Sequence, residues 1–146
     1  MKRRIQGLRD ADQSAIDPIS DGLFLVRVER AQYRWQGQKP YYLLRFVVLE
    51  PKPVAGRLIT GRVYCTPRAL WKLSWSLRDF GYDTELLGRD EIDEKALVGL
   101  CGVVKISHTV MHGTPLLDLD GFAPTSQWEE LSAAQPANVS NSRVAS

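Results

Sequence analysis

Residues 41–65 of the chain are YYLLRFVVLEPKPVAGRLITGRVYC. Apolar side chains recur at every second position of residues 41–50, and those that share one face are Tyr42, Leu44, Phe46 and Val48. This period of two predicts a strand with one face in a core. Pro51 and Gly56 mark a turn, after which residues 57–65 alternate again. The stretch therefore predicts two consecutive strands, and with them a mainly β fold.

An earlier strand is predicted for residues 22–30, where Phe24, Val26 and Val28 alternate with charged residues. Residues 32–40 are polar and contain Gly37, so we expect them to form a loop. The strands on either side of this loop are expected to form a hairpin with a long tip.

The hydrophobic period changes after residue 65. Thr66 is a residue type that caps helices, and Pro67 suits the first helical position. Apolar residues then follow at helical spacing: Leu70, Leu73, Leu77 and Phe80. Gly81 is placed to end the helix in a left-handed conformation. A helix is therefore predicted over residues 67–81, with its apolar stripe buried.

The remaining elements follow this helix. Residues 82–100 are expected to form a polar, acidic connection with a short helix within residues 90–97. Strands are predicted at residues 102–111 and 116–122, separated by a turn at residues 112–114.

Five strands with a helix between the third and the fourth follow the order of the OB-fold, a small Greek-key barrel. In that fold we expect the helix to plug one end of the barrel. Ligands are expected across the second and third strands, between the loops that join strands one to two and four to five. The alternative architecture is another small α+β sheet packed on one helix.

The length of 146 residues suits one domain. We expect a flexible arm over residues 1–20, the OB-fold domain over residues 21–124, and a disordered tail over residues 125–146. No apolar run approaches the ~18 residues that span a membrane, and residues 1–20 lack the apolar region of a secretory signal. We therefore expect a cytoplasmic protein without a membrane partner, in which Cys65 and Cys101 are buried free thiols.

Charge is distributed unevenly along the chain. Residues 27–72 carry ten basic residues against two acidic ones, whereas residues 78–94 carry seven acidic residues against two basic ones. This asymmetry predicts a polyanionic partner for the basic segment. The alternative is a solvated surface whose two parts neutralise each other.

Aromatic and cationic residues interleave on the predicted ligand face. Single-stranded nucleic acid is held by cations that follow its phosphates and by rings on which its bases stack. The candidate nucleic-acid-binding residues are Tyr33, Arg34, Trp35, Lys39, Tyr41, Arg45, Arg57, Arg62 and Tyr64. For the aromatic members the alternative is packing, across the strands or within the loop. Trp71 and Trp75 lie beside the helix stripe and are interpreted as packing residues.

Catalytic and metal-binding patterns are weak. Asp118 and Asp120 share one strand face, and we interpret them as exposed acids rather than metal ligands. His108 and His112 are four residues apart in a strand and a turn, which does not direct both at one metal. Neither cysteine has an activating neighbour. We therefore expect no enzymatic activity, no catalytic residue, no metal and no cofactor.

The sequence GQKPYYLLRFVV at residues 37–48, preceded by VERA at residues 28–31, resembles phage and mobile-element proteins of the DUF669 type. Residues 57–64, the predicted helix and residues 98–104 are also similar, so the likeness covers about residues 20–124. The resemblance implies a single-stranded DNA-binding OB-fold protein of replication and recombination modules. The chain ends in SRVAS, unlike the acidic tip with a terminal Phe by which bacterial single-stranded DNA-binding proteins recruit partners.

Together these observations predict a protein that binds single-stranded DNA largely independently of sequence, for the replication or recombination of a phage or mobile element. Replication or recombination proteins would be further partners, and a homodimer is an open alternative to a monomer. The alternative function is an OB module that binds protein, or RNA or an oligosaccharide, without binding DNA.

Overall fold

The computed structural model describes residues 2, 3 and 19–134. Most of the arm predicted for residues 1–20, and residues 135–146 of the predicted tail, lie outside the described residues. The elements are, in chain order, β1 (Gly22–Gln36), β2 (Lys39–Glu50), η1 (Lys52–Val54), β3 (Leu58–Tyr64), α2 (Leu70–Asp79), α3 (Thr84–Gly88), α4 (Glu94–Leu97), β4 (Cys101–Met111), β5 (Thr114–Ala123), η2 (Thr125–Gln127) and α5 (Trp128–Ala134).

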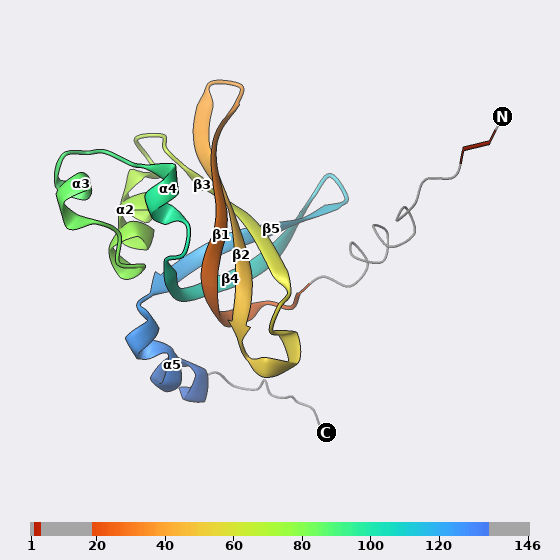
Figure 1. Cartoon of the computed structure of the whole chain (residues 1–146). Coiled ribbons are helices and arrows are strands. Elements are labelled where there is room, and N and C mark those ends of the chain that lie inside the picture. The colour runs from red at the N-terminus through yellow and green to blue at the C-terminus, as the bar shows by residue number, and fades with distance from the viewer. Residues whose placement is uncertain (1, 4–18, 135–146) are drawn as a thin grey trace.

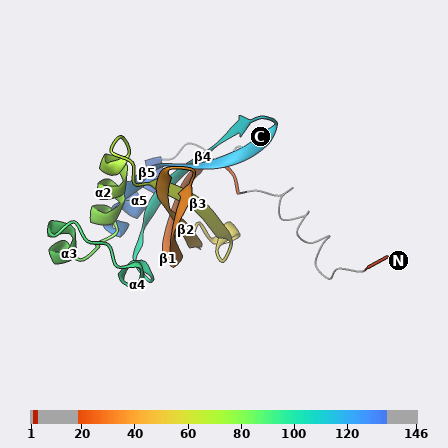
Figure 2. The same ribbon diagram turned by 90° about the horizontal axis from the view of Figure 1, so that it is seen from above.

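All five strands belong to one antiparallel sheet with the order β3-β2-β1-β4-β5, which confirms the mainly β prediction. β1 pairs with β2 over most of its length but with β4 only through residues 22–27. Two long hairpins, β1–β2 and β4–β5, therefore diverge from their shared base (Figure 1). Seen from above, α2, α3 and α4 gather on one side of the β1–β2 hairpin, and the β4–β5 tip extends to the other side (Figure 2).

The sheet curls so that its outer strands, β3 and β5, approach each other. A Cβ atom built on Gly61 of β3 would lie only 2.7 Å from Cγ of Leu119 in β5. Among the described residues no hydrogen-bonded ladder joins these two strands. The sheet is therefore open, and its two edges meet through side-chain packing.

The core lies between the inner face of this sheet and α2. Leu73 and Leu77 of α2 and Phe80, directly after its last residue, are buried, as predicted. Phe80 contacts the rings of Phe46 and Phe122 at centroid distances of 6.0 and 6.2 Å. Leu70, predicted for the same stripe, is instead 48% exposed. It is the first residue of the helix.

The sequence predicted the C-terminal end of α2 correctly but not its N-terminal end. The helix begins at Leu70 rather than Pro67, because the backbone of residues 66–69 forms a turn in which the Ala69 amide donates to the Thr66 carbonyl. The predicted Thr66 cap is therefore wrong. At the other end, Gly81 has a φ of 78°, and the Tyr82 amide donates to the Leu77 carbonyl. This is the left-handed helix end that the sequence predicted.

The region predicted as a loop over residues 32–40 is instead strand on both sides of a two-residue tip. β1 continues to Gln36 and β2 begins at Lys39, so that only Gly37 and Gln38 form the turn. Gly37 has a φ of 61°, which glycine adopts without steric cost in tight hairpin turns. The hairpin is therefore a paired ladder whose exposed end extends beyond the core.

A β-bulge in β1 decides which side chains this hairpin presents on each face. Val28 pairs with Phe46, whereas Arg30 pairs with Arg45, so Glu29 and Arg30 together stand opposite one residue of β2. The bulge reverses the alternation of every later residue in β1. Arg34 is thereby placed on the same face as Arg45, and Tyr33 on the opposite face.

The acidic connection contains two short helices, α3 and α4; only α4 falls within the predicted residues 90–97. The Tyr82 hydroxyl fixes the connection, because it donates to the Glu91 carbonyl at 3.0 Å and accepts from the Asp93 amide at 2.8 Å. Residues 125–134, assigned to a disordered tail from composition, instead form η2 and α5. Leu131 of α5 lines a hollow together with Leu23 of β1 and Trp75 of α2.

Cys65 and Cys101 are free thiols, and both are partly buried. Burial raises the pKa of the Cys65 thiol. No helix among the described residues is long and apolar enough to cross a membrane.

Candidate nucleic-acid interface

The outward face of β1, β2 and β3 is strongly cationic. We call it the basic face and define it by the outward side chains of residues 27–36, 39–47 and 58–64, since directly paired residues of adjacent strands share a face. Its cations are Arg27, Arg30, Arg34, Lys39, Arg45 and Arg62. Within these residues Glu29 is the single carboxylate on the face, and it pairs with Arg45 at 3.5 Å. Both of these side chains remain well exposed.

Side chains from all three strands meet around Arg62. Its guanidinium donates to Oε1 of Gln36 at 2.8 Å and lies over the ring of Tyr41, 5.0 Å from the centroid. The Tyr64 hydroxyl donates to the same Gln36 oxygen at 2.8 Å. A further hydrogen bond, with Tyr64, raises the pKa of Arg62. The cation is therefore held in one place before any ligand arrives.

Tyr41 supports this arrangement from below. Its side chain is only 6% exposed, and its ring lies 5.4 Å from that of Tyr64. A ring this buried has no free face for a base, so the predicted stacking role does not suit Tyr41. Tyr64 is half-buried and lies at the rim of the face.

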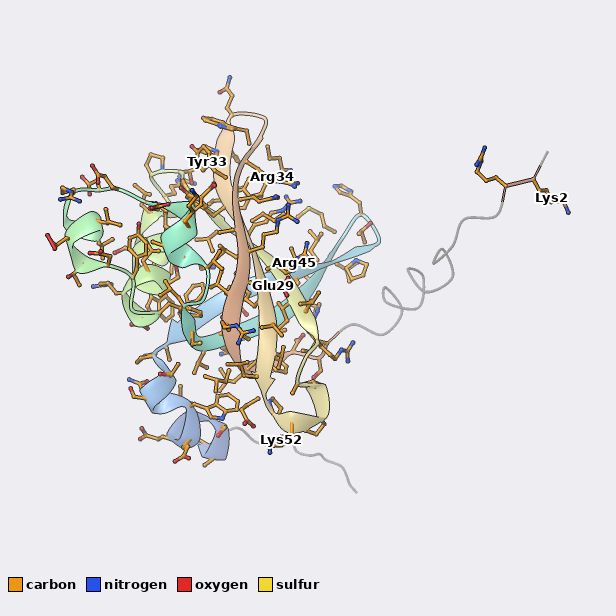
Figure 3. The ribbon with its side chains drawn as sticks, viewed as in Figure 1. Lys2, Glu29, Tyr33, Arg34, Arg45 and Lys52 are labelled. Carbon is orange, nitrogen blue, oxygen red and sulfur yellow. The ribbon has the colours of Figure 1, made fainter. Side chains whose placement is uncertain are left out.

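Tyr33 and Trp35 are not brought together with the other candidate residues. The bulge directs them to the face of the hairpin that points toward α4, where their rings pack edge to face at 6.0 Å and Tyr33 covers Tyr42 at 5.2 Å. The Tyr33 amide donates to Oε2 of Glu94 at 2.7 Å. Figure 3 shows Tyr33 on the α4 side of the hairpin and Arg34 and Arg45 on the other side. The acidic surroundings are unsuitable for a phosphate.

The other predicted cations occupy different parts of the molecule. Arg34 lies on the hairpin and donates to Gln32 at 2.6 Å, and Lys39 is exposed beside the hairpin tip. Arg57 precedes β3, at the end of the sheet far from that tip, where its carbonyl accepts from the Val48 amide. The structure thus gathers Arg34, Lys39, Arg45, Arg62 and Tyr64 on one face and leaves Arg57 at its margin.

An open groove adjoins the basic face. We call it the β3–β5 groove; its volume is about 580 Å³. One wall contains cations and rings of β3 and the start of α2: Arg62, Tyr64, Arg68, Trp71 and Lys72. The other wall is formed by residues 115–120 of β5. A second hollow of about 500 Å³ extends it toward Lys39 and shares Tyr64 and Arg68 with it.

The two walls of the groove differ in charge. The β3 and α2 wall is cationic, whereas Asp118 and Asp120 stand on the β5 wall. Asp118 accepts a hydrogen bond from the Thr109 hydroxyl at 3.2 Å. Lys72 bridges the walls by donating to the Leu119 carbonyl at 2.8 Å. A polyanion in this groove is therefore drawn to one wall and repelled from the other.

Sequence reasoning missed Arg68, Trp71 and Lys72. Trp75 does pack as predicted, since its Nε1 donates to Asp79 at 2.8 Å and its ring meets Phe122 edge to face at 5.6 Å. Trp71 is different, because it is 61% exposed. The sequence contained a signal for them. Trp71, Lys72 and Trp75 follow helical spacing beside the apolar stripe, and Arg68 stands in the turn just before the helix.

No protein-family model matches the chain, and no curated protein matches it. The resemblance of residues 20–124 to the DUF669 type therefore stays a prediction.

Proposed function

We propose that this protein binds single-stranded DNA on the basic face, largely independently of sequence and without enzymatic activity. The observation that carries the proposal is the Arg62 cluster, in which a cation, a ring and a hydrogen-bonding amide from three strands are fixed beside an open groove of about 580 Å³. The sheet order and the approach of β3 to β5 at Gly61 support an OB-type architecture, with an incompletely paired barrel seam.

Binding would combine two contributions. Arg34, Lys39, Arg45 and Arg62 would neutralise phosphates along the face and release counterions, which makes the affinity depend on salt. Tyr64, held by its hydroxyl contact with Gln36, would stack on a base. Because every base has a π face, such stacking tolerates any sequence.

The remainder of the proposal rests on the resemblance of residues 20–124. It comprises a role in replication or recombination of a phage or mobile element and contacts with proteins of those processes. A cytoplasmic location is a separate proposal that rests on the sequence pattern alone. The helix of the OB-type plug would be α2, whose Leu73 and Leu77 enter the core together with Phe80, directly after its last residue.

The proposal is tested by fluorescence anisotropy of a labelled thirty-nucleotide dT strand at two salt concentrations. We expect tight binding at low salt, with a logarithmic salt slope of about −0.7 per neutralised phosphate. Unlabelled duplex of the same length should compete poorly, and so should heparin at matched charge. Absence of binding at low salt would overturn the proposal. If heparin competes as well as unlabelled dT, the basic face is a general polyanion-binding surface and not a DNA site. If the matching RNA strand binds more tightly than dT, the ligand is RNA.

A second candidate function is a protein-interaction module, and the tip of the β4–β5 hairpin favours it. Val110, Met111 and Leu116 are exposed there, and apolar groups gathered on a surface commonly mark protein contacts. If the tip joins two copies, light scattering should give twice the chain mass for the wild type and the single mass for Met111→Glu. A single mass for both would remove the homodimer from consideration.

A further inference from the structure

We infer that the bound strand does not end at the sheet but continues through the β3–β5 groove along the start of α2, where Trp71 is a second stacking platform. The inference deepens the proposed function and rests on it. It assigns to α2 a part in binding that its position in the sequence, between β3 and β4, does not indicate.

The shape of the surface gives the path. Tyr64 and Arg68 belong both to the hollow that begins at Lys39 and to the β3–β5 groove. The two depressions are therefore neighbours that share a border at Tyr64 and Arg68, and we call them together the channel. A strand that follows the cations of the hairpin would pass Tyr64 and meet the first turn of α2 next.

Charge restricts how a strand lies in this channel. Arg62, Arg68 and Lys72 stand on one wall, and Asp118 and Asp120 on the other. Phosphates are favoured beside the first wall and repelled by the second. With its backbone on the β3 and α2 wall, the strand directs its bases into the groove, within reach of Trp71 on the same wall.

Trp71 has the properties of a stacking platform. One face of its ring lies against Trp75, with the ring centroids 6.0 Å apart and the planes 19° from parallel. Trp75 is itself fixed by its hydrogen bond to Asp79 and by Phe122. Trp71 itself is 61% exposed, so much of its surface is accessible to a ligand. A base placed there would extend an existing stack at little cost in side-chain order.

Trp35 provides a matched control within the same chain. It is 60% exposed, almost the same fraction as Trp71, but it lies on the opposite face of the hairpin, on the side of Glu94. If any exposed tryptophan sufficed for binding, the two would behave alike. If the channel defines the path, only Trp71 should contact the strand.

The first experiment compares Trp71→Ala with Trp35→Ala in the dT anisotropy titration. We expect Trp71→Ala to weaken binding between about 5-fold and 150-fold, the range of one stacked base, with an unchanged salt slope because no charge is lost. Trp35→Ala should stay within about 2-fold of the wild type. Equal effects of the two changes, or no effect of Trp71→Ala, would overturn the inference.

The two failures are distinguishable. If the proposed function fails, the wild type itself does not bind dT. If only the inference fails, the wild type binds and Arg62→Ala weakens binding, but Trp71→Ala does not. Thermal melting of each variant establishes whether a loss of binding reflects unfolding.

Photocrosslinking of the wild type keeps the test independent of any variant. A dT strand with 5-iodouracil is irradiated in complex with the full chain, which is then digested with trypsin. Trp71 falls in the peptide of residues 69–72 and Trp35 in that of residues 35–45. Adducts at residues 69–72 are expected; adducts confined to residues 35–45 would place the strand on the hairpin alone and overturn the inference.

Discussion

The guanidinium of Arg62 lies over the ring of Tyr41, with Cζ 5.0 Å from the ring centroid. This distance is within the range of a cation–π interaction. The pair comes from adjacent strands and is closed by Gln36 of a third strand. Arginine suits this position because its flat group stacks on a ring and donates in two directions, whereas an ammonium is a strongly hydrated point charge.

Two substitutions of Arg62 should therefore distinguish what its charge contributes to DNA binding from what its stacked geometry contributes. Arg62→Lys keeps the charge, so the salt slope of dT binding should be unchanged while affinity falls by roughly 1 kcal/mol as the stacked arrangement is lost. Arg62→Ala should lower affinity further and reduce the slope by about 0.7. Anisotropy titrations over a series of salt concentrations measure both quantities. Identical slopes for Arg62→Ala and the wild type would exclude a phosphate contact at Arg62.

Arg45 and Arg89 are a matched pair of arginines that tests whether binding depends on the position of a positive charge on the basic face. Each is exposed and bonded to one glutamate, Arg45 to Glu29 at 3.5 Å and Arg89 to Glu91 at 3.3 Å. Arg45 lies on the basic face, whereas Arg89 lies in the acidic connection. Arg45→Ala should flatten the salt dependence by about 0.7, and Arg89→Ala should leave it unchanged. A similar effect of both changes would mean that binding responds to net charge only.

The contact between Gly61 and Leu119 should make Gly61 intolerant of any side chain. A Cβ atom there would lie 2.7 to 3.0 Å from three side-chain atoms of Leu119, so Gly61→Ala must displace the Leu119 side chain or push β3 and β5 apart. We expect a loss of about 1–3 kcal/mol in the free energy of unfolding, measured in urea. Gly88→Ala is the control, since a Cβ atom at Gly88 meets nothing within 4 Å.

A double variant tests whether that cost arises at the β3–β5 contact. Leu119→Ala removes the clashing atoms, so Gly61→Ala should cost less in its presence than in the wild type, and a double-mutant cycle measures the difference. If the two changes are simply additive, the clash is relieved elsewhere and the edges of the sheet do not depend on this contact.

The alternation of apolar residues was sufficient to predict all five strands, because a half-buried strand exposes its period directly in the sequence. The bulge at Glu29 and Arg30 could not be predicted in the same way. It depends on how β1 pairs with β2, and no residue type demands it. Its effect is large, because without it Tyr33 and Trp35, rather than Arg34, would share the outward face with Arg45.

The β3–β5 groove could not be predicted from the local sequence pattern, for a different reason. Its walls come from residues 60–72 and 115–120, which meet only because the sheet curls at Gly61. The polar stripe of α2 was visible in the sequence. Whether Trp71 would be buried, however, depended on how closely β5 packs against α2, which the sequence does not indicate. The prediction of disorder from composition was also wrong for residues 125–134, which form η2 and α5.

Stability at high pH should depend on Tyr42. This side chain is buried beneath Tyr33, and burial raises its pKa from the ordinary 10.0 to about 12, with smaller contributions from Cys65 and Glu94. The folded state therefore keeps the phenol proton at pH values where the unfolded state has lost it. The stability is fully present below pH ~10 and falls by about 1.4 kcal/mol per pH unit as the pH rises toward 12.

The variant Tyr42→Phe isolates this contribution, because it keeps the ring in the core and removes the titrating group. Urea unfolding at pH 8 and pH 11 should show a smaller fall in stability for Tyr42→Phe than for the wild type. The other tyrosines are common to both proteins, so their titration cancels from the comparison. An equal fall in the two proteins would show that Tyr42 loses its proton as readily in the folded chain as in the unfolded one.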